Sequence, residues 1–451
     1  MRPRLRFPSL LWLVASAACT GDPSSGATAG ATDATEASST AAGMDPTGGD
    51  QGLDGTASTD ADSSVETGLP TGATEGPSSS SETGDTSAGE ATGDTSTDGT
   101  TGGGTASVGL DHRLAGGGGF YCVVATDATV RCWGAGNDSQ LGDGQADDSG
   151  VPVVALGLAD IQHVTSAEWH TVARDGAGGF QVFGASQYGQ LGLGDFVFHA
   201  QPVAQPNLDA GDHLAVGGNH SCAAHADGTV SCWGLGDSGQ LGFVASEPCI
   251  NSMCATTPTL VPDLTDVFAV TAGSNHTCAL LGDGSVVCWG AGAEGQLGPG
   301  GAGGPNAVEV PGLGDVVQLV VGGGRSCVLE ESGAVVCWGY ELGADPVPVP
   351  ALADAVFFDT TWDHGCAVLG DGTVACWGSN AYGKLGDGTL EPRPNAAPVV
   401  GITGAVEVAV NAFSSCALLA NDEVWCWGYN GFGMLGNGVP GDSTLPVQVA
   451  L

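Results

Sequence analysis

The sequence predicts an all-β fold, a seven-bladed β-propeller, behind a secretory signal peptide and a long linker. The chain of 451 residues contains 78 glycines and only four methionines, a composition typical of many tight turns rather than of helices. Aromatic–glycine steps recur through its last three-quarters at intervals near fifty residues. A period of that length, with several short strands in each unit, indicates propeller blades.

The start of the chain has the pattern of a secretory signal peptide. Three arginines within the first six residues precede an apolar stretch from Phe7 to Ala18, which is too short to stay in a bilayer as a spanning helix. Cys19 follows small residues directly, so the segment resembles a bacterial lipobox whose cysteine is lipidated. In such lipoproteins, Asp directly after the lipidated cysteine favours retention in the inner membrane. Thr20 stands at this position, so the resemblance implies the outer membrane. Ser16 stands where a lipobox usually has leucine, which leaves ordinary cleavage near Ala18 and an extracellular protein as the alternative.

The segment behind Cys19 predicts a flexible tether. Residues 20–107 consist mostly of Ser, Thr, Gly and Ala, and they include fifteen acids and no base. Such a composition cannot bury enough apolar surface to offset the entropy of ordering. As a flexible coil, the segment would span about 50 Å from end to end. We therefore expect three parts: a signal peptide (1–18), a disordered acidic linker (19–107) and the propeller (108–451).

Seven copies of one unit make up the propeller. Its clearest copy runs from Ala272 to Gly298 and holds a Cys288-Trp289-Gly290 step followed by Gly-Gln-Leu-Gly. An Asp-Gly pair between apolar runs, as at Asp283, predicts a hairpin turn. The runs are apolar on both faces, which suits a blade covered by two neighbours. The aromatic residues that define the seven units are Trp133, Phe183, Trp233, Trp289, Trp338, Trp377 and Trp427.

A short segment rich in Pro and Val ends each unit. The last of these segments, Pro446 to Ala450, lies at the C-terminus, and none precedes the first unit. We therefore expect residues 446–450 to supply a strand that the first blade lacks, because ring closure of this kind leaves no open sheet edge.

The unit Trp-Gly-x5-Gly-Gln-Leu-Gly, with Gly-x-x-His-x-Cys upstream, closely resembles the repeats of the regulator of chromosome condensation (RCC1) family over residues 108–451. The resemblance implies a seven-bladed propeller, here of a bacterial, exported, lipoprotein type. The family includes a nuclear exchange factor for a small GTPase and secreted bacterial propellers, one of which inhibits β-lactamases. No residue of the exchange loop can be matched, so exchange activity is less expected.

The repeat also sorts all fifteen cysteines. Six units hold two cysteines ten residues apart, which would face each other across the Asp-Gly hairpin within disulfide reach. The second unit has Val172 and Val182 instead, and bonded partners are lost together in this way. An exported compartment is oxidising, so we expect disulfides, with buried free thiols as the alternative. The expected pairs are Cys122–Cys132, Cys222–Cys232, Cys249–Cys254, Cys278–Cys288, Cys327–Cys337, Cys366–Cys376 and Cys416–Cys426.

Several patterns match ligand-binding motifs but have simpler structural interpretations. Two Gly-x-Gly-x-x-Gly runs lack the helix and βαβ unit of a dinucleotide site. Four histidines share one repeat position, where we expect them to satisfy backbone groups of their blades rather than to bind a metal. Three acids in one loop fit no defined calcium-binding pattern. We expect no cofactor, no metal and no catalytic constellation. The residues are Gly234, Gly236, Gly239, Gly290, Gly292, Gly295, His170, His220, His276, His364, Asp143, Asp147 and Asp148.

The charge balance limits the partners. Without the three arginines of the signal peptide, the chain has six basic and fifty acidic residues. This excess of negative charge argues against nucleic acid as a binding partner. The function predicted is a monomeric, non-catalytic binding module at the cell surface that recognises a protein or glycan through propeller loops. A secreted enzyme inhibitor is the alternative, and an enzyme using scattered carboxylates is less expected. Ile250 and Met253, in a six-residue excess of the third unit, are predicted to contact the partner.

Overall fold

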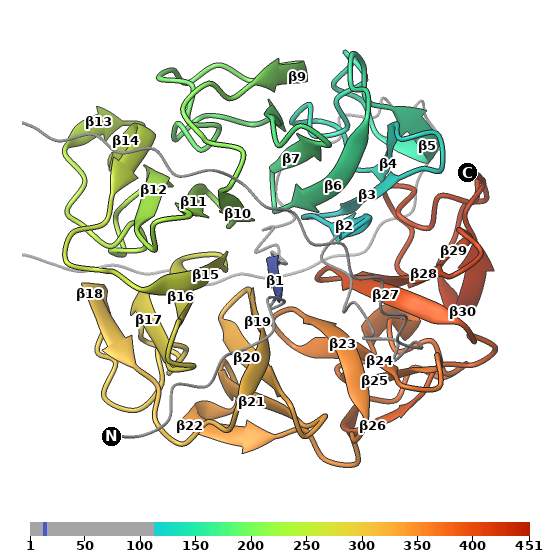
Figure 1. Cartoon of the computed structure of the whole chain (residues 1–451). Coiled ribbons are helices and arrows are strands. Elements are labelled where there is room, and N and C mark those ends of the chain that lie inside the picture. The colour runs from blue at the N-terminus through green and yellow to red at the C-terminus, as the bar shows by residue number, and fades with distance from the viewer. Residues whose placement is uncertain (1–11, 16–111) are drawn as a thin grey trace, which may run out of the picture. The chain divides into compact units, whose positions relative to one another are not determined.

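The structure, a computed structural model, describes residues 12–15 and 112–451. Residues 112–451 form seven antiparallel sheets arranged as blades in a ring (Figure 1). The predicted all-β, seven-bladed propeller is therefore confirmed. Cys19 and the predicted linker lie outside the described residues. Of the predicted signal peptide, only the strand β1 (Trp12–Ala15) is described, and it pairs in parallel with β19.

Each blade contributes one strand to the wall of the central channel and one to the rim (Figure 1). The first, innermost strands are β2 (Leu114–Gly116), β6 (Ile161–Ser166), β10 (His213–Val216), β15 (Val267–Ala272), β19 (Val316–Gly322), β23 (Ala355–Thr360) and β27 (Ala405–Val410). The second strands are β3 (Phe120–Val124), β7 (His170–Asp175), β11 (His220–Ala224), β16 (His276–Leu281), β20 (Arg325–Glu330), β24 (His364–Leu369) and β28 (Ser414–Leu419).

The aromatic–glycine step ends the third strand of every blade. These strands are β4 (Val130–Gly134), β8 (Phe180–Gly184), β12 (Val230–Leu235), β17 (Val286–Gly290), β21 (Val335–Gly339), β25 (Val374–Gly378) and β29 (Val424–Gly428). The fourth strands are β5 (Ser149–Val154), β9 (His199–Ala204), β14 (Ser252–Leu260), β18 (Gly304–Glu309), β22 (Gly343–Pro348), β26 (Arg393–Pro398) and β30 (Ser443–Gln448). The third blade adds β13 (Glu247–Cys249), and a 3-10 turn, η1 (Ala381–Gly383), lies in the sixth.

Burial explains why the middle strands are apolar on both faces. All five residues of β3 and of β11 are buried, because neighbouring blades cover both sides of each sheet. The glycine after the aromatic residue is required by its backbone: Gly290 has φ +107, and a Cβ there would lie 2.7 Å from the carbonyl oxygen of Asn275. Only glycine adopts such a φ without strain.

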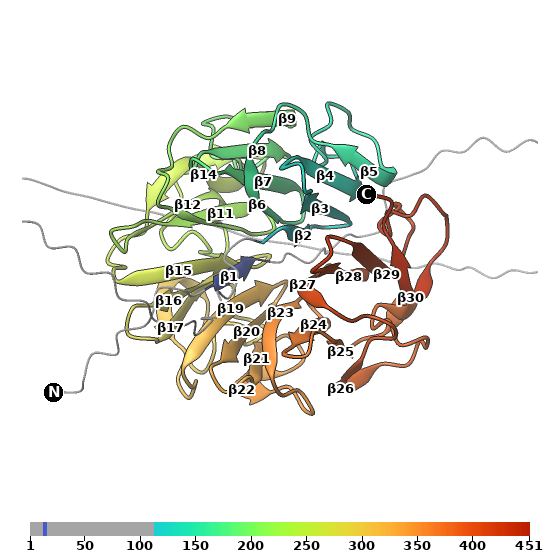
Figure 2. The ribbon, with the colours of Figure 1, turned by 45° about the vertical axis from the view of Figure 1, so that its right-hand side comes forward.

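The prediction that the C-terminal segment completes the first blade is wrong. β30 pairs with β29 of its own, seventh blade, and β2 to β5 form a complete first blade without it. Each Pro/Val segment is the fourth strand of its own unit, so every blade is one continuous piece of chain. The seventh blade lies beside the first and closes the ring (Figures 1 and 2). The Glu407 carboxylate accepts from the backbone N–H groups of Arg113 and Leu114, and the backbone N–H of Gly438 donates to the Gly150 carbonyl (2.9 Å).

The ring has two faces of different construction. We call the loop face the one formed by the turns between first and second strands and the loops between third and fourth strands. The turn face carries the tight turns between second and third strands, such as that at Asp283, and the connections from one blade to the next. The loops of the loop face differ most in length between blades.

Candidate functional site

The Gly-Gln-Leu-Gly motif joins neighbouring blades. The backbone carbonyl of Gln240, in the third blade, accepts hydrogen bonds from Thr277 Oγ1 (2.8 Å) and Trp289 Nε1 (3.0 Å) of the fourth. The same arrangement occurs at Gln190 and Gln296. A buried carbonyl with two donors is fully satisfied, so the motif residues that define the repeat have a structural role.

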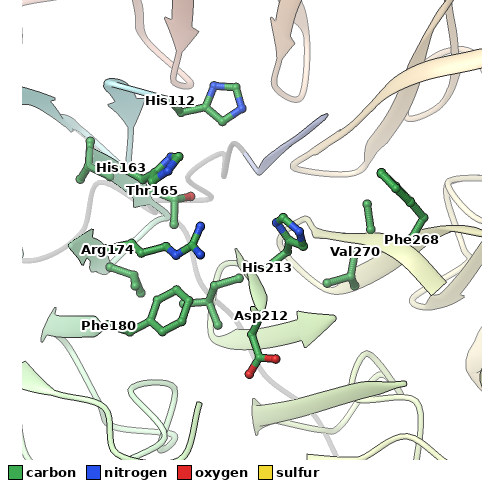
Figure 3. Close-up of a pocket in the computed structure, with 13 residues that line it drawn as sticks. His112, His163, Thr165, Arg174, Phe180, Asp212, His213, Phe268 and Val270 are labelled. Carbon is green, nitrogen blue, oxygen red and sulfur yellow. The ribbon is translucent and has the colours of Figure 1, made fainter. Parts of the chain in front are cut away.

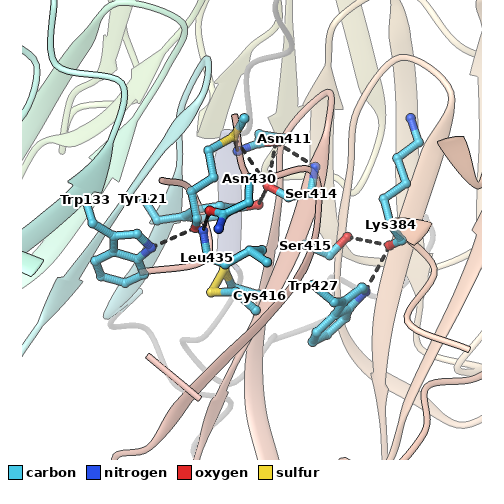
Figure 4. The surroundings of a disulfide bond; sticks show 12 residues. Tyr121, Trp133, Lys384, Asn411, Ser414, Ser415, Cys416, Trp427, Asn430 and Leu435 are labelled. Atoms are coloured by element: carbon cyan, nitrogen blue, oxygen red, sulfur yellow. Dashed lines mark hydrogen bonds between the residues drawn. A yellow bond between two sulfur atoms is a disulfide. The ribbon is translucent and has the colours of Figure 1, made fainter. Parts of the chain in front are cut away.

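The sixth and seventh blades keep this junction with other side chains. Lys384 stands in place of the glutamine in the sixth blade, and its carbonyl accepts from Ser415 Oγ and Trp427 Nε1, both at 2.9 Å (Figure 4). At the junction between the last blade and the first, Trp133 Nε1 donates to the Met434 carbonyl (2.9 Å). The contact between blades uses only the backbone oxygen, so Lys384 and Met434 can preserve it. The glutamine side chains serve their own loops, as when Gln240 Oε1 accepts from the backbone N–H of Ser238 (2.9 Å).

The four repeat histidines also connect blades, which corrects the expectation that they satisfy backbone groups within their own blades. His220 Nε2 lies 2.9 Å from Thr277 Oγ1. That hydroxyl already donates its only hydrogen to Gln240, so the histidine must donate and is a neutral Nε2–H tautomer. The equivalent pairs are His170–Ser221, His276–Ser326 and His364–Ser415. The sequence carries this signal, since each of these histidines is followed by Ser or Thr at the next position of the next unit.

The fifth blade breaks the pattern. Only Tyr340 to Leu342 separate β21 from β22, so this blade has no Gly-Gln-Leu-Gly loop. The fifth blade therefore offers no loop carbonyl to the sixth, and the sixth blade has Gly365 at the position where the other blades have a hydroxyl side chain. Arg325 stands at the position of the repeat histidine that would otherwise face that hydroxyl. The Arg325 guanidinium is buried and donates to the Tyr340 carbonyl (3.1 Å).

An ion pair of the sixth blade lies near Arg325 at this irregular junction. Lys384 Nζ lies 2.7 Å from Asp363 Oδ1 and also donates to the carbonyl of Ala412 (3.0 Å). Burial alone would raise the pKa of the Asp363 carboxyl, but His364 and Lys384 lower it well below its usual range. Asp363 is therefore ionised, and its partly exposed carboxylate reaches the loop face.

Aromatic rings gather beside this ion pair on the loop face. Tyr429 contacts Tyr382 (4.8 Å between ring centroids), Phe413 (5.8 Å) and Phe432 (6.2 Å). Tyr382 and Phe432 are 45% and 39% exposed. Tyr382 has φ +64, a strained conformation for a bulky residue that is found more often at functional sites. Exposed aromatic residues of this kind are enriched in protein interfaces.

The insertion of the third blade is a hairpin closed by a disulfide. β13 pairs with β14, and Cys249 and Cys254 are bonded with Cα atoms 6.0 Å apart. Ile250 is 62% and Met253 49% exposed, so both can be reached by a partner. Their predicted role in partner contact stays a prediction.

The six other cysteine pairs lie at the predicted positions and at disulfide-bonding distance. Their Cα atoms are 4.0–4.1 Å apart on the facing second and third strands of their blades. Val172 and Val182 face each other at the same place in the second blade. Seven disulfides indicate an oxidising environment. Among the described residues, no helix is long and apolar enough to span a membrane.

The acidic residues are used locally. Asp148 Oδ1 accepts from Gly136 N and Asn137 Nδ2, while Asp143 Oδ1 accepts from Gln145 N. Within residues 112–451, no three His, Cys, Asp or Glu side chains converge as metal ligands do. On the turn face, Asp283 accepts from the Ser285 side chain and backbone, which lowers the pKa of its carboxyl.

The fold and its junctions define a class of protein, a propeller scaffold whose blades are complete repeat units and whose loops carry variation. Profiles of the regulator of chromosome condensation (RCC1) repeat match residues 127–174 and 227–280, and, with a second profile, residues 212–240, 269–296, 358–384 and 405–433. The chain therefore contains RCC1 repeats over these residues, as its resemblance to that family implied.

Among curated relatives, the ultraviolet-B receptor UVR8 of Arabidopsis thaliana is 31% identical over 191 residues, which are 42% of each chain. Protein pim1 of Schizosaccharomyces pombe is 29% identical over 43% of this chain and 38% of its own. The match thus spans about two-fifths of these relatives. Among solved structures, Prp20p of Saccharomyces cerevisiae, described with its binding properties to Gsp1p and histones, has a TM-score of 0.61 at 20% identity over 75% of this chain and 86% of that one. Human WBSCR16 has a TM-score of 0.58 at 24% identity, and the match covers 67% of this chain and 85% of that one.

Proposed function

We propose that this chain is an exported, non-catalytic binding protein whose propeller recognises another protein through its loop face. Lipidation of Cys19 would attach it to the outer membrane, and residues 20–107 would hold the propeller away from the bilayer. The seven disulfides support export. Because β1 lies within the segment proposed as the signal peptide, we expect it to be absent from the mature chain.

The observation that carries the proposal is the stapled hairpin of the third blade. Ile250 and Met253 project from a loop that the repeat does not need, and the disulfide beside them limits its motion. Exposed apolar side chains on a rigid loop lose little entropy when a partner binds. Propellers of the RCC1 type bind proteins, as Prp20p does with Gsp1p and histones. We carry over only the use of a propeller as a protein-binding scaffold.

The test is capture of envelope proteins with the propeller, followed by the same capture with Ile250→Ser and Met253→Ser combined. Neither substitution touches the core, so the fold should be kept. Leu260→Ser, which changes a 56% exposed residue on β14, is the matched control. We expect the double variant to lose most of the captured partner and the control to retain it. Equal capture by all three proteins would contradict the role of the hairpin.

Enzyme inhibition is the second candidate, supported by the aromatic group around Tyr429. Tyrosine side chains such as Tyr382 and Tyr429 are enriched among the residues that contribute most to binding in protein interfaces. If the captured partner is a hydrolase, its activity should fall on addition of the propeller. Capture of oligosaccharide instead of protein would favour the glycan alternative.

A further inference from the structure

A small pocket opens on the turn face, where the innermost strands of the second, third and fourth blades meet at the channel. It has a volume of about 80 Å³. Its wall combines apolar side chains, among them Phe180 and Val270, with the polar groups of Thr165, Arg174 and His213 (Figure 3). The Arg174 guanidinium points into this space (Figure 3). The pocket lies at the opposite end of the blades from the loop face, and it plays no part in the function proposed above.

Arg174 differs from the other arginines and lysines in residues 112–451 by having no carboxylate partner within 4 Å. The paired bases are Arg113 with Asp422, Arg131 with Asp127, Arg325 with Glu341, Lys384 with Asp363 and Arg393 with Asp387. In a chain with fifty acids and nine bases, an arginine without an acid is unexpected.

The contacts that Arg174 does make leave part of its guanidinium unused. One terminal nitrogen donates to the Ala210 carbonyl (2.5 Å), and the group lies 5.7 Å from the ring centre of Phe180. Its Nε is buried and has no hydrogen-bond partner among the described residues. A buried N–H without an acceptor is costly, so an acceptor in the pocket would remove that cost.

The nearest acid of the wall cannot serve as that acceptor. Asp212 turns away from the guanidinium (Figure 3). One of its oxygens lies 3.0 Å from His225 Nδ1, and the other accepts from the backbone N–H of Asp209. Asp212 is thus already engaged on the far side of the wall, and it does not neutralise Arg174.

We propose that this pocket binds a single carboxylate group carried on a short apolar stem. A guanidinium matches a carboxylate with parallel hydrogen bonds, and Thr165 and His213 can add one donor each. The volume equals that of two to three water molecules at roughly 30 Å³ each, which suits one carboxylate with a few carbons against Phe180 and Val270. The tight turns of this face carry Asp127, Asp175, Asp227, Asp283 and Asp371. Their carboxylates repel anions in proportion to the charge of the anion, so they disfavour phosphate and other multiply charged groups. The carboxylate can belong to a free small acid or to the end of a peptide.

The experiment compares propionate with propionamide, its uncharged counterpart, on the full chain as cells produce it. Saturation-transfer NMR should show contact of propionate with the protein and at least about tenfold weaker contact of propionamide, because the charged hydrogen bonds are lost. An acetylated tripeptide with a free C-terminus and its amide test the peptide source in the same way. Equal binding of acid and amide in both pairs would overturn the proposal.

Two variants locate the site. Arg174→Gln should reduce propionate binding by about tenfold or more, whereas Arg131→Gln, which removes a partly exposed and paired base elsewhere on the turn face, should leave it unchanged. Unreduced binding to Arg174→Gln would also overturn the proposal. If that variant fails to fold, Thr165→Val replaces it, with a severalfold loss expected, and the comparison of acid with amide on the unaltered chain still decides.

Discussion

The four buried histidines should make the propeller sensitive to mild acid. Burial lowers the pKa of His170, His220 and His276 to about 3, and that of His364 to about 4, from the ordinary 6.5. The unfolded chain takes up a proton at each of these sites near pH 6.5, whereas the folded chain takes it up only near pH 3–4. Below pH 6.5 the unfolded state therefore binds more protons, and stability falls as the pH falls through this window.

The size of the effect follows from the pKa values. At pH 5, which is 1.5 below the unfolded value, each histidine costs about 2 kcal/mol, and four cost roughly 8 kcal/mol. Glu168 acts in the opposite direction: burial raises the pKa of its carboxyl to about 7, so protonation stabilises the folded state by about 2 kcal/mol at pH 5. The net loss between pH 7 and pH 5 is then about 6 kcal/mol, a large part of a typical folding free energy.

Urea unfolding at pH 7 and pH 5 measures this loss. His220→Phe should reduce it by about 2 kcal/mol, and the first blade shows that phenylalanine fits, since Phe120 occupies the same position there. In the reverse change, Phe120→His, the introduced imidazole would face the hydroxyl of Thr171. This variant should increase the loss of stability between pH 7 and pH 5 by a similar amount. If His220→Phe left the difference between the two pH values unchanged, the assignment of acid sensitivity to these histidines would be refuted.

Three further outcomes are expected. Cys19→Ala should move the protein from membrane to soluble fractions, and unaltered fractionation would contradict lipidation. Cys278→Val combined with Cys288→Val should lower the unfolding free energy by about 3 kcal/mol or less, as valines already replace a pair in the second blade, while alkylation of the unreduced, denatured wild type should label no propeller cysteine. Lys384→Met, which leaves Asp363 without its buried cation, should destabilise the fold by roughly 1–3 kcal/mol in urea unfolding, and a smaller change would show that the ion pair is dispensable.

The number and kind of blades could be predicted because each repeat carries its own local signals. The aromatic–glycine step and the Asp-Gly turn fix a hairpin whatever surrounds it, and the facing cysteines follow from that hairpin. The assignment of Pro446 to the first blade failed because strands of a propeller look alike, and no local signal says whether a segment pairs backward or forward along the chain.

The pocket at Arg174 could not be predicted for a different reason. Its wall comes from the second, third and fourth blades and from His112, which precedes the first blade. The decisive fact is that no acid of the described residues pairs with the Arg174 guanidinium, and only a folded chain shows this. The same holds for Lys384 and Asp363, which are 21 residues apart in sequence and are brought together by the fold of the sixth blade. The hydrogen bonds between the histidines and the next blade are partly predictable from the sequence. The paired residues can be recognised in the repeats once the junction between blades is known.

Because every blade is one unbroken stretch of chain, the ring has no preferred starting point. Between other blades, the sixth and seventh for example, six residues (399–404) join the rim strand to the next inner strand. At the gap between the ends, three residues follow β30 and two described residues precede β2. A peptide bond or a one-residue bridge there would give the seventh blade a connection to the first of nearly the same length as most of the others, although eight residues (205–212) join the second blade to the third. The propeller could then be cut at any blade boundary and rejoined in a new order, so that a fused domain or a surface could be attached at whichever of the seven positions leaves the loop face free.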